Sequence, residues 1–180
     1  GLGNTIGTYS SPKQVGSLTN WLKVIAGVYS SAAIKTDGTL WTWGKGSVGQ
    51  LGLGNTTNYS SPKLVGSLTD WLNLASSTYS KYAIKTNGTM WSWGYGVEGR
   101  LGLGNVTNYS SPKQIGALTS WLSIAAGYYF AVAVKTDGTL WSWGGNGQGQ
   151  LGLGNRTYYS SPKQIGSLTT WSSEVSCGQQ

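Results

Sequence analysis

Five carboxylates and a single thiol are the side chains of this 180-residue sequence best suited to acid–base or nucleophilic chemistry. The sequence contains no His, and Cys177 is its only Cys, which excludes a zinc site of the usual kind, a Ser-His-Asp triad and a disulfide within the chain. Glycoside hydrolysis needs two carboxylates close together, but the carboxylates here are scattered along the sequence. We therefore expect no enzyme, no catalytic residue, no metal ligand and no cofactor. The five carboxylates are Asp37, Asp70, Glu98, Asp137 and Glu174.

The cationic side chains suggest a different chemistry, the binding of phosphate groups. Lys and Arg number 12 and give a formal net charge of +7, and neutralisation of phosphates by such charges drives nucleic-acid binding. Most of the lysines, however, recur at two positions of a repeated unit, which spreads them over the molecule. We interpret them as solvated or structural residues and expect no nucleic acid among the partners. They are Lys13, Lys63, Lys113 and Lys163, and Lys35, Lys85 and Lys135.

An internal repeat with a period of 50 residues sets the positions of these side chains. The period is marked by Trp21, Trp71, Trp121 and Trp171, and by four copies of Tyr-Ser-Ser-Pro-Lys. The chain holds three full units, residues 1–50, 51–100 and 101–150, and the opening of a fourth, residues 151–180. Because the 10 Trp and most of the 29 Gly belong to the repeated unit, we interpret the tryptophans as packing residues and the glycines as turn residues.

Each unit is expected to form about four short strands. Residues 32–36 and 39–43 flank Asp37-Gly38, a two-residue link typical of a type I′ hairpin. Pairing across such a turn places Ile34 beside Trp41 and Ala32 beside Trp43. Residues 21–26 and 12–16 supply two further strands, and no helical period is present. A repeated four-stranded sheet indicates the blade of an all-β propeller, and we expect about three and a half blades.

The glycine-rich segment after the hairpin carries a resemblance to a known family. Gly-Gln-Leu-Gly-Leu-Gly-Asn at 49–55 follows Trp43-Gly44, and the segment returns at 99–105 and 149–155. Together with Ile34-Lys35-Thr36-Asp37-Gly38-Thr39-Leu40-Trp41, it resembles the regulator of chromosome condensation repeat. The resemblance implies a β-propeller, usually of seven blades. Asp-Gly-Thr-Leu-Trp is also similar to segments of propeller lectins, which do not share the glycine-rich loop.

The length of the chain accounts for barely half of a seven-bladed ring. We expect residues 1–180 to be a single propeller segment that belongs to a longer chain. Closure of one ring by two copies is an alternative, but the order of the expected strands at the two joins disfavours it.

Positions at which the units differ are the best candidates for a binding site, because the shared positions are used by the fold. The differences gather in the loop after Trp-x-Trp-Gly and in the segment before the hairpin, although neutral drift explains any single one equally well. The candidate binding residues are Lys45, Tyr79, Lys81, Tyr82, Tyr95, Glu98, Tyr128, Phe130, Asn146 and Gln148.

In its regular copies, few charges and Ser/Thr/Asn-rich linkers, the sequence resembles bacterial and phage surface proteins. The leading hypothesis is a non-enzymatic structural or binding module of a virion, such as a phage fibre or capsid decoration, or of a cell surface. Its expected partners are other proteins, copies of itself or a host-surface glycan, and its expected location is the virion or the extracellular surface. Family resemblance supports one alternative, a regulatory binder such as a guanine nucleotide exchange factor or an inhibitor of a secreted enzyme. A propeller lectin is the other. No apolar run approaches the ~20 residues of a membrane span.

Overall fold

Three four-stranded antiparallel sheets make up the computed structural model, which describes residues 11–17 and 19–178. The first blade contains β1 (Trp21–Ala26), β2 (Ser30–Lys35), β3 (Leu40–Gly44) and β4 (Tyr59–Leu64). The second contains β5 (Trp71–Ser76), β6 (Ser80–Lys85), β7 (Met90–Gly94) and β8 (Tyr109–Gln114), with the 3-10 helix η1 (Val97–Gly99) after β7. The third contains β9 (Trp121–Ala126), β10 (Phe130–Lys135), β11 (Leu140–Gly144) and β12 (Tyr159–Gln164).

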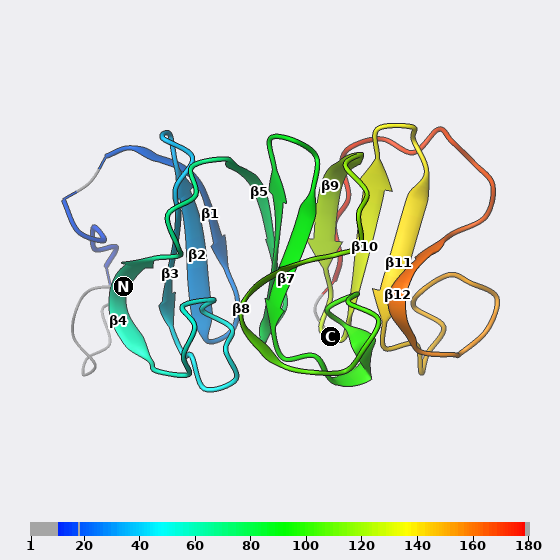
Figure 1. Cartoon of the computed structure of the whole chain (residues 1–180), viewed down its shortest axis with the longest axis horizontal. Helices are drawn as coiled ribbons and strands as arrows, with labels where there is room; N and C mark the ends of the chain where they lie inside the picture. The colour runs from blue at the N-terminus through cyan, green and yellow to red at the C-terminus, as the bar shows by residue number, and fades with distance from the viewer. Residues whose placement is uncertain (1–10, 18, 179–180) are drawn as a thin grey trace.

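The blades stand side by side with their sheets face to face, as in a propeller (Figure 1). Each sheet follows chain order, so that β1, β5 and β9 form one edge and β4, β8 and β12 the other. Strand β5 contacts both β1 and β9, whereas β4, β8 and β12 lie on the side toward the viewer in Figure 1. The all-β propeller architecture predicted from the repeat is therefore confirmed.

The hairpin between β2 and β3 differs from the prediction by one residue. Gly38 N–H donates to the Lys35 carbonyl at 2.9 Å and Lys35 N–H to the Thr39 carbonyl at 3.0 Å. Within the turn only Gly38 has a positive φ, 77°. This is a three-residue loop in which a left-handed glycine forms a bulge, instead of a two-residue type I′ turn. Ile34 consequently pairs with Leu40 and Ala33 with Trp41.

This register sorts each hairpin into a tryptophan face and an aliphatic face. In the first blade Ala33, Trp41 and Trp43 share one face, and Ala32, Ile34, Leu40 and Thr42 share the other. The predicted pairs Ile34–Trp41 and Ala32–Trp43 are wrong, because the extra loop residue shifts β3 by one position and reverses the face of each of its side chains.

The number of blades is three, and not three and a half, in the described part of the chain. Residues 12–16 and 171–178, the counterparts of β4 and β1, form no strand there. The Tyr-Ser-Ser-Pro-Lys segment at the start of each later unit completes the preceding blade as its fourth strand. Proline is tolerated in this strand because it lies at the edge of the sheet.

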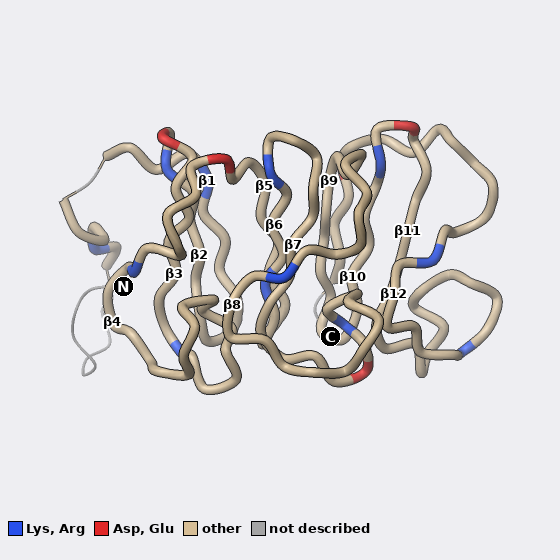
Figure 2. The backbone as a smooth tube through the Cα atoms, in the orientation of Figure 1, with Lys and Arg blue, Asp and Glu red and all other residues tan. Residues whose placement is uncertain are grey.

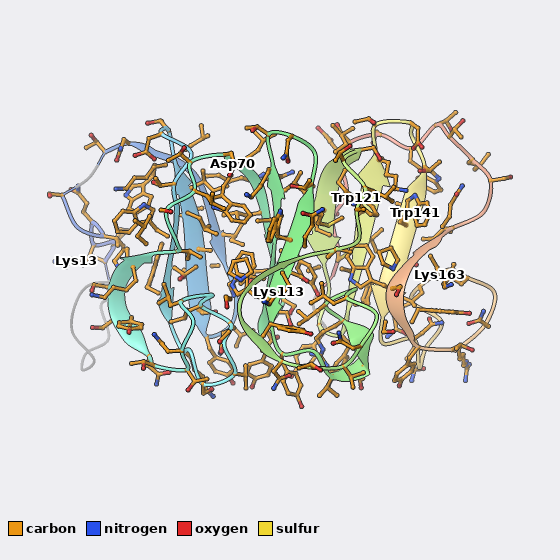
Figure 3. All side chains as sticks on the ribbon, in the orientation of Figure 1. Lys13, Asp70, Lys113, Trp121, Trp141 and Lys163 are labelled. Carbon is orange, nitrogen blue, oxygen red and sulfur yellow. The ribbon has the colours of Figure 1, made fainter. Side chains whose placement is uncertain are left out.

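The core lies at the two junctions between blades, where a tryptophan face meets an aliphatic face. Trp93 packs with Ile34 and Leu40 of the preceding blade, and Trp143 packs with Ile84 and Met90. Both indoles are completely buried, so the packing role predicted for these tryptophans is confirmed. Trp121 and Trp141 lie next to each other (Figure 3), with ring centroids 6.1 Å apart.

In the described part of the chain, no blade covers the tryptophan face of the first blade. Val24 is 66% exposed, whereas Leu74 and Ile124 at the same repeat position are 4% and 6% exposed. An apolar hollow of about 180 Å³ on this face is lined by Val15, Trp21, Val24, Ala33 and Trp43.

The repeated lysine of β2, β6 and β10 has a structural role. Lys35, Lys85 and Lys135 are buried at the ends of their strands, and Lys35 Nζ lies 4.0 Å from the ring centroid of Trp41. The charged end therefore rests on indole rings while the stem covers apolar surface. In Figure 2 the cationic residues are scattered over all three blades without forming one stripe.

Candidate binding surface

The segments that vary between units meet at one end of the blades. Ser30, at the start of β2, pairs with Gly44, at the end of β3, so the loop before β2 and the loop after β3 lie at the same end. The Asp-Gly turn lies at the opposite end, together with Asp70 (Figure 3), which forms an ion pair with Lys85 at 3.3 Å. The same arrangement holds in the second and third blades.

Five tyrosines at this end form a surface that we call the tyrosine band. The rings of Tyr29 and Tyr79 stack with centroids 5.7 Å apart, and those of Tyr79 and Tyr95 meet edge to face at 6.1 Å. Tyr128 and Tyr129 continue the band on the third blade, with centroids 4.3 Å apart. The band therefore crosses all three blades.

Two cations hold the rings of the band in place. Lys45 Nζ lies 5.1 Å from the centroid of Tyr29 and 5.8 Å from that of Tyr79. The Arg100 guanidinium lies 5.0 Å from the centroid of Tyr95 and 4.8 Å from that of Tyr129. Each cation thus lies over rings from two blades, an arrangement that orders them through cation–π attraction.

Arg100 is itself held by three oxygen atoms. Its Nη2 forms an ion pair with Glu98 at 3.2 Å, its Nε donates to the Val97 carbonyl at 2.8 Å, and its Nη1 donates to the Tyr128 carbonyl at 3.3 Å. Glu98 has φ 65°, a left-handed conformation that its side chain disfavours. The carboxylate that pairs with Arg100 thus belongs to a residue whose backbone is strained.

The hydroxyls of Tyr79 and Tyr129 remain protonated at neutral pH. Desolvation, followed by the neighbouring tyrosines, raises the pKa of Tyr79 and the pKa of Tyr129 above the usual value. Protonated hydroxyls can both donate and accept hydrogen bonds. The band consequently offers ring faces and neutral polar groups together.

Two hollows lie along the band. The first, of about 330 Å³, is lined by Lys45, Ser47, Val48, Tyr79 and Tyr95. The second, of about 340 Å³, is lined by Tyr128, Tyr129, Phe130, Gln148, Gln150 and Gly178. Aromatic rings beside a few polar groups are typical of binding pockets.

The structure brings together seven of the ten residues proposed from the sequence. They lie on or beside the tyrosine band: Lys45, Tyr79, Tyr95, Glu98, Tyr128, Phe130 and Gln148.

The other three are buried and hold the fold together, so they do not present a surface to a partner. Lys81 Nζ donates to Ser30 Oγ at 2.7 Å, and the Tyr82 hydroxyl donates to the Arg100 carbonyl at 2.6 Å. Asn146 donates to the Asn155 carbonyl at 2.9 Å. Lys81 and Tyr82 contact a neighbouring blade, and Asn146 is held by the loop that follows it. Sequence variation alone therefore did not distinguish them from surface residues.

The candidate residues chosen from the sequence did not include Tyr29, Tyr129, Arg100 and Gln150, although the variable segments contain both tyrosines. A signal was present for the tyrosines, because Tyr29 and Tyr129 are the copies of Tyr79 in the other units. Arg100 also stands out, since both other units have Gln at this position.

Two of the remaining carboxylates are engaged, and the thiol is unreactive. The carboxylates of Asp37 and Asp137 accept hydrogen bonds from Thr39 and Thr139 in their own turns, and this lowers the pKa of both. Burial raises the pKa of the Cys177 thiol to about 11, so little thiolate is available at neutral pH. Within the described residues, no group of three or more Cys, Asp or Glu is arranged to hold a metal ion, and no helix is long and apolar enough to cross a membrane.

Comparison with known proteins identifies the repeat. A sequence model of the regulator of chromosome condensation (RCC1) repeat matches residues 37–79, 87–134 and 137–180, and a second model of this repeat matches residues 23–50 and 121–150. The chain belongs to the RCC1 repeat family. No curated protein matches the chain significantly.

Solved structures share the RCC1 propeller fold at low sequence identity. Prp20p from Saccharomyces cerevisiae, described with its binding to Gsp1p and histones, is 20% identical with a TM-score of 0.76, and the match covers 86% of this chain and 40% of Prp20p. Human WBSCR16 is 22% identical with a TM-score of 0.71, over 80% of this chain and 37% of its own. The RCC1-repeat chain thus spans about two fifths of the length of these relatives.

Proposed function

We propose that this RCC1-repeat chain is a binding module that contacts a protein partner through the tyrosine band. The observation that carries the proposal is a continuous set of tyrosine rings across three blades, ordered by Lys45 and Arg100 and still open to solvent. Tyr29 is 50% exposed and Tyr129 is 42% exposed. Tyrosine supplies large contact area at a low cost in side-chain entropy, and Tyr and Arg are enriched among residues that dominate protein interfaces.

Regulatory binding is the second candidate, and family membership favours it. Prp20p binds Gsp1p and histones, and yeast RCC1 has been solved bound to Kap60. Because the present chain spans less than half of these proteins, exchange of nucleotide on a small GTPase remains a proposal.

The location of the module remains a prediction. The support for a virion or extracellular surface is compositional, since only 9% of the residues are charged. Labelling of intact virions or cells with antibodies against the chain tests it, and a signal that appears only after lysis contradicts it. Contact with a host glycan or with further copies of the chain also stays a prediction.

Site-directed photo-crosslinking tests the proposed surface. A photo-reactive phenylalanine analogue in place of Tyr79 is expected to crosslink the chain to a partner protein, either in the cells that produce the chain or in the virions that carry it. Thr86 is the matched control, because it is exposed and lies in the turn at the opposite end of the same blade. Crosslinking of the same protein with equal yield from both positions would contradict binding through the band.

Purified probes separate the candidate partners. Binding is measured to a nucleotide-free small GTPase, to a histone octamer and to an array of neutral glycans. Replacement of Tyr79 and Tyr129 by Ser is expected to weaken true binding at least tenfold, because both rings leave the contact surface. If Tyr79→Ser and Tyr129→Ser both bind a probe as tightly as the wild type does, that probe binds elsewhere on the molecule.

A further inference from the structure

The chain contains two Asn-Gly pairs, Asn87-Gly88 and Asn146-Gly147, and the fold places them in opposite surroundings. Asn87 lies exposed in the turn between β6 and β7, whereas Asn146 is 0% exposed. An asparagine side chain reacts most readily with its own backbone when glycine follows, because glycine has no side chain to shield the attacking nitrogen. The surroundings therefore decide which of the two pairs can react.

The side-chain carbonyl of Asn87 is held and polarised by Thr89. Its Oδ1 accepts a hydrogen bond from the Thr89 backbone N–H at 3.1 Å and another from the Thr89 hydroxyl at 2.8 Å. These bonds keep the side chain close to Gly88, and they stabilise negative charge on Oδ1 as the donors of an oxyanion hole do. Asn87 Nδ2, the group that must leave, makes no hydrogen bond within the described part of the chain. The Gly88 N–H donates to the Lys85 carbonyl at 2.9 Å, and breaking this one bond frees the nucleophile.

The side-chain amide of Asn146 is clamped on both sides. Its Nδ2 donates to the Asn155 carbonyl at 2.9 Å and to the Thr157 carbonyl at 3.0 Å, and its Oδ1 accepts from the Leu151 N–H at 3.0 Å. Departure of this nitrogen breaks two hydrogen bonds inside the protein, and the burial of the side chain keeps water away from it. We therefore expect this pair to be inert in the folded chain.

The repeat shows that the turn accepts an acid in place of Asn87. The same position is Asp37 in the first unit and Asp137 in the third. Thr39 and Thr139 donate to these carboxylates as Thr89 donates to the amide, with the backbone N–H at 3.0 Å and the hydroxyl at 2.6 Å in both turns. An aspartate formed in the second turn would find its two donors already in place.

We propose that Asn87 is a site of spontaneous deamidation, which converts the turn of the second blade into the Asp-Gly turn of the other two. The Gly88 nitrogen gives up its proton and bonds to Cγ of Asn87, while the bond from Cγ to Nδ2 breaks and ammonia leaves. Water then opens the resulting succinimide ring. Opening at Cγ gives aspartate, and opening at the backbone carbonyl gives isoaspartate, so water is the only co-reactant and the net charge falls by one. The turn lies at the end of the blade opposite to the tyrosine band, so the reaction does not depend on the proposed function.

Peptide mapping by mass spectrometry tests the proposal on the folded chain. During incubation in mildly alkaline buffer, Asn87 is expected to deamidate at least about tenfold faster than Asn146, because the clamped amide reacts only when its loop opens. The rate at Asn87 should rise with hydroxide concentration, since the Gly88 nitrogen must lose its proton. Equal rates at the two pairs, or no reaction at Asn87, would overturn the proposal.

Unfolding in urea is the control for the role of the structure. Both pairs are then expected to react at similar rates, because neither keeps its hydrogen bonds. If Asn146 stayed unreacted in urea, its protection would not come from the fold, and the structural argument would fail. Asn87→Gln is the matched variant, because a side chain longer by one methylene does not close the five-membered ring. An unchanged yield of acidic product in Asn87→Gln would place the reaction elsewhere in the chain.

Asn87→Asp reproduces the aspartate product and tests whether the turn accepts it. Its Tm is expected to equal that of the wild type, because Thr89 can donate to the new carboxylate as Thr39 does to Asp37. The isoaspartate form, separated by ion exchange from aged protein, is expected to have a lower Tm because its backbone contains one additional carbon in the turn. A clear loss of stability in Asn87→Asp would contradict conversion into an equivalent turn. If that variant fails to fold, the same conclusion follows, and peptide mapping of the wild type still decides whether Asn87 reacts.

Discussion

The indole N–H of Trp143 donates a hydrogen bond to the backbone carbonyl of Arg100 at 2.9 Å, across the junction between the second and third blades. Trp93 makes the equivalent bond to the Gln50 carbonyl at 3.2 Å at the first junction. The repeated tryptophan therefore fastens each blade to the glycine-rich loop of the blade before it. This bond makes the glycine-rich loop, which carries the family resemblance, part of the packing between blades.

Trp143→Phe tests the contribution of this bond. We expect the free energy of unfolding to fall by about 1–3 kcal/mol, because the variant loses buried volume and leaves the Arg100 carbonyl with one partner fewer. Trp43→Phe is the control, since Trp43 has the same repeat position on the open face of the first blade and is only partly buried. Urea denaturation of both variants provides the comparison, and equal losses would contradict a special role for the junction.

Gly52→Ala tests the close approach of the glycine-rich loop to Trp93. A Cβ at Gly52 would lie 2.8 Å from Trp93 Nε1, and φ is also 72°. Gly54 has φ 78° but no atom within 4 Å of such a Cβ, so Gly54→Ala should show the backbone cost alone, about 1 kcal/mol. We expect Gly52→Ala to lose more than about 2 kcal/mol in the same urea experiment. Similar losses in both variants would mean that the loop moves away from the indole without cost.

The repeat predicted the blades, because its period was evident in residues such as Trp21 and Trp71. The hairpin register was not predictable with the same certainty, since Asp-Gly fits both a two-residue turn and a three-residue loop with a bulge. The choice depends on which residue pairs with Leu40, and that in turn depends on packing against the next blade.

The candidate site, like the fold, was predictable only in part. Variation between the units drew attention to the two loop regions where the tyrosine band lies, because solvent-facing loops are free to differ. The burial of Lys81 was not predictable, because its partner Ser30 lies 51 residues away on another blade. Contacts across a junction exist only when the blades are packed together.

Lys81 should make the stability of the chain depend on pH. Burial lowers its pKa from 10.5 to about 7, so between these values the unfolded chain binds more protons than the folded chain. The penalty for burying the charge is then full below about pH 7, and stability rises as the pH increases toward 10.5.

Lys81→Met removes this dependence and isolates it from other titrating groups. We expect the variant to exceed the wild type in stability most strongly near pH 6, by up to about 4–5 kcal/mol. The difference should shrink steadily toward pH 9.5. Calorimetry at several pH values measures it, and a difference that stays constant from pH 6 to 9.5 would show that Lys81 does not titrate in this range.

Arg100→Gln tests how the tyrosine band is held together. Glutamine is the residue of both other units at this position, so we expect the loop to keep its fold while the guanidinium contacts with Glu98, Tyr95 and Tyr129 are lost. The expected loss in unfolding free energy is about 1–3 kcal/mol. Nuclear magnetic resonance should show the ring signals of Tyr95 and Tyr129 shifting, while that of Tyr29, which lies against Lys45, stays in place.

A double-mutant cycle with Glu98→Gln separates the ion pair from the other contacts of Arg100. Because Glu98 is 29% exposed, solvent screens the pair, and we expect a coupling energy of about 0.5–1 kcal/mol. Most of the loss in Arg100→Gln should therefore remain in the Glu98→Gln background, carried by the hydrogen bond to Tyr128 and by the tyrosine rings. If the whole loss disappeared in that background, the ion pair alone would hold Arg100, and the contact between the second and third blades would contribute nothing to its position.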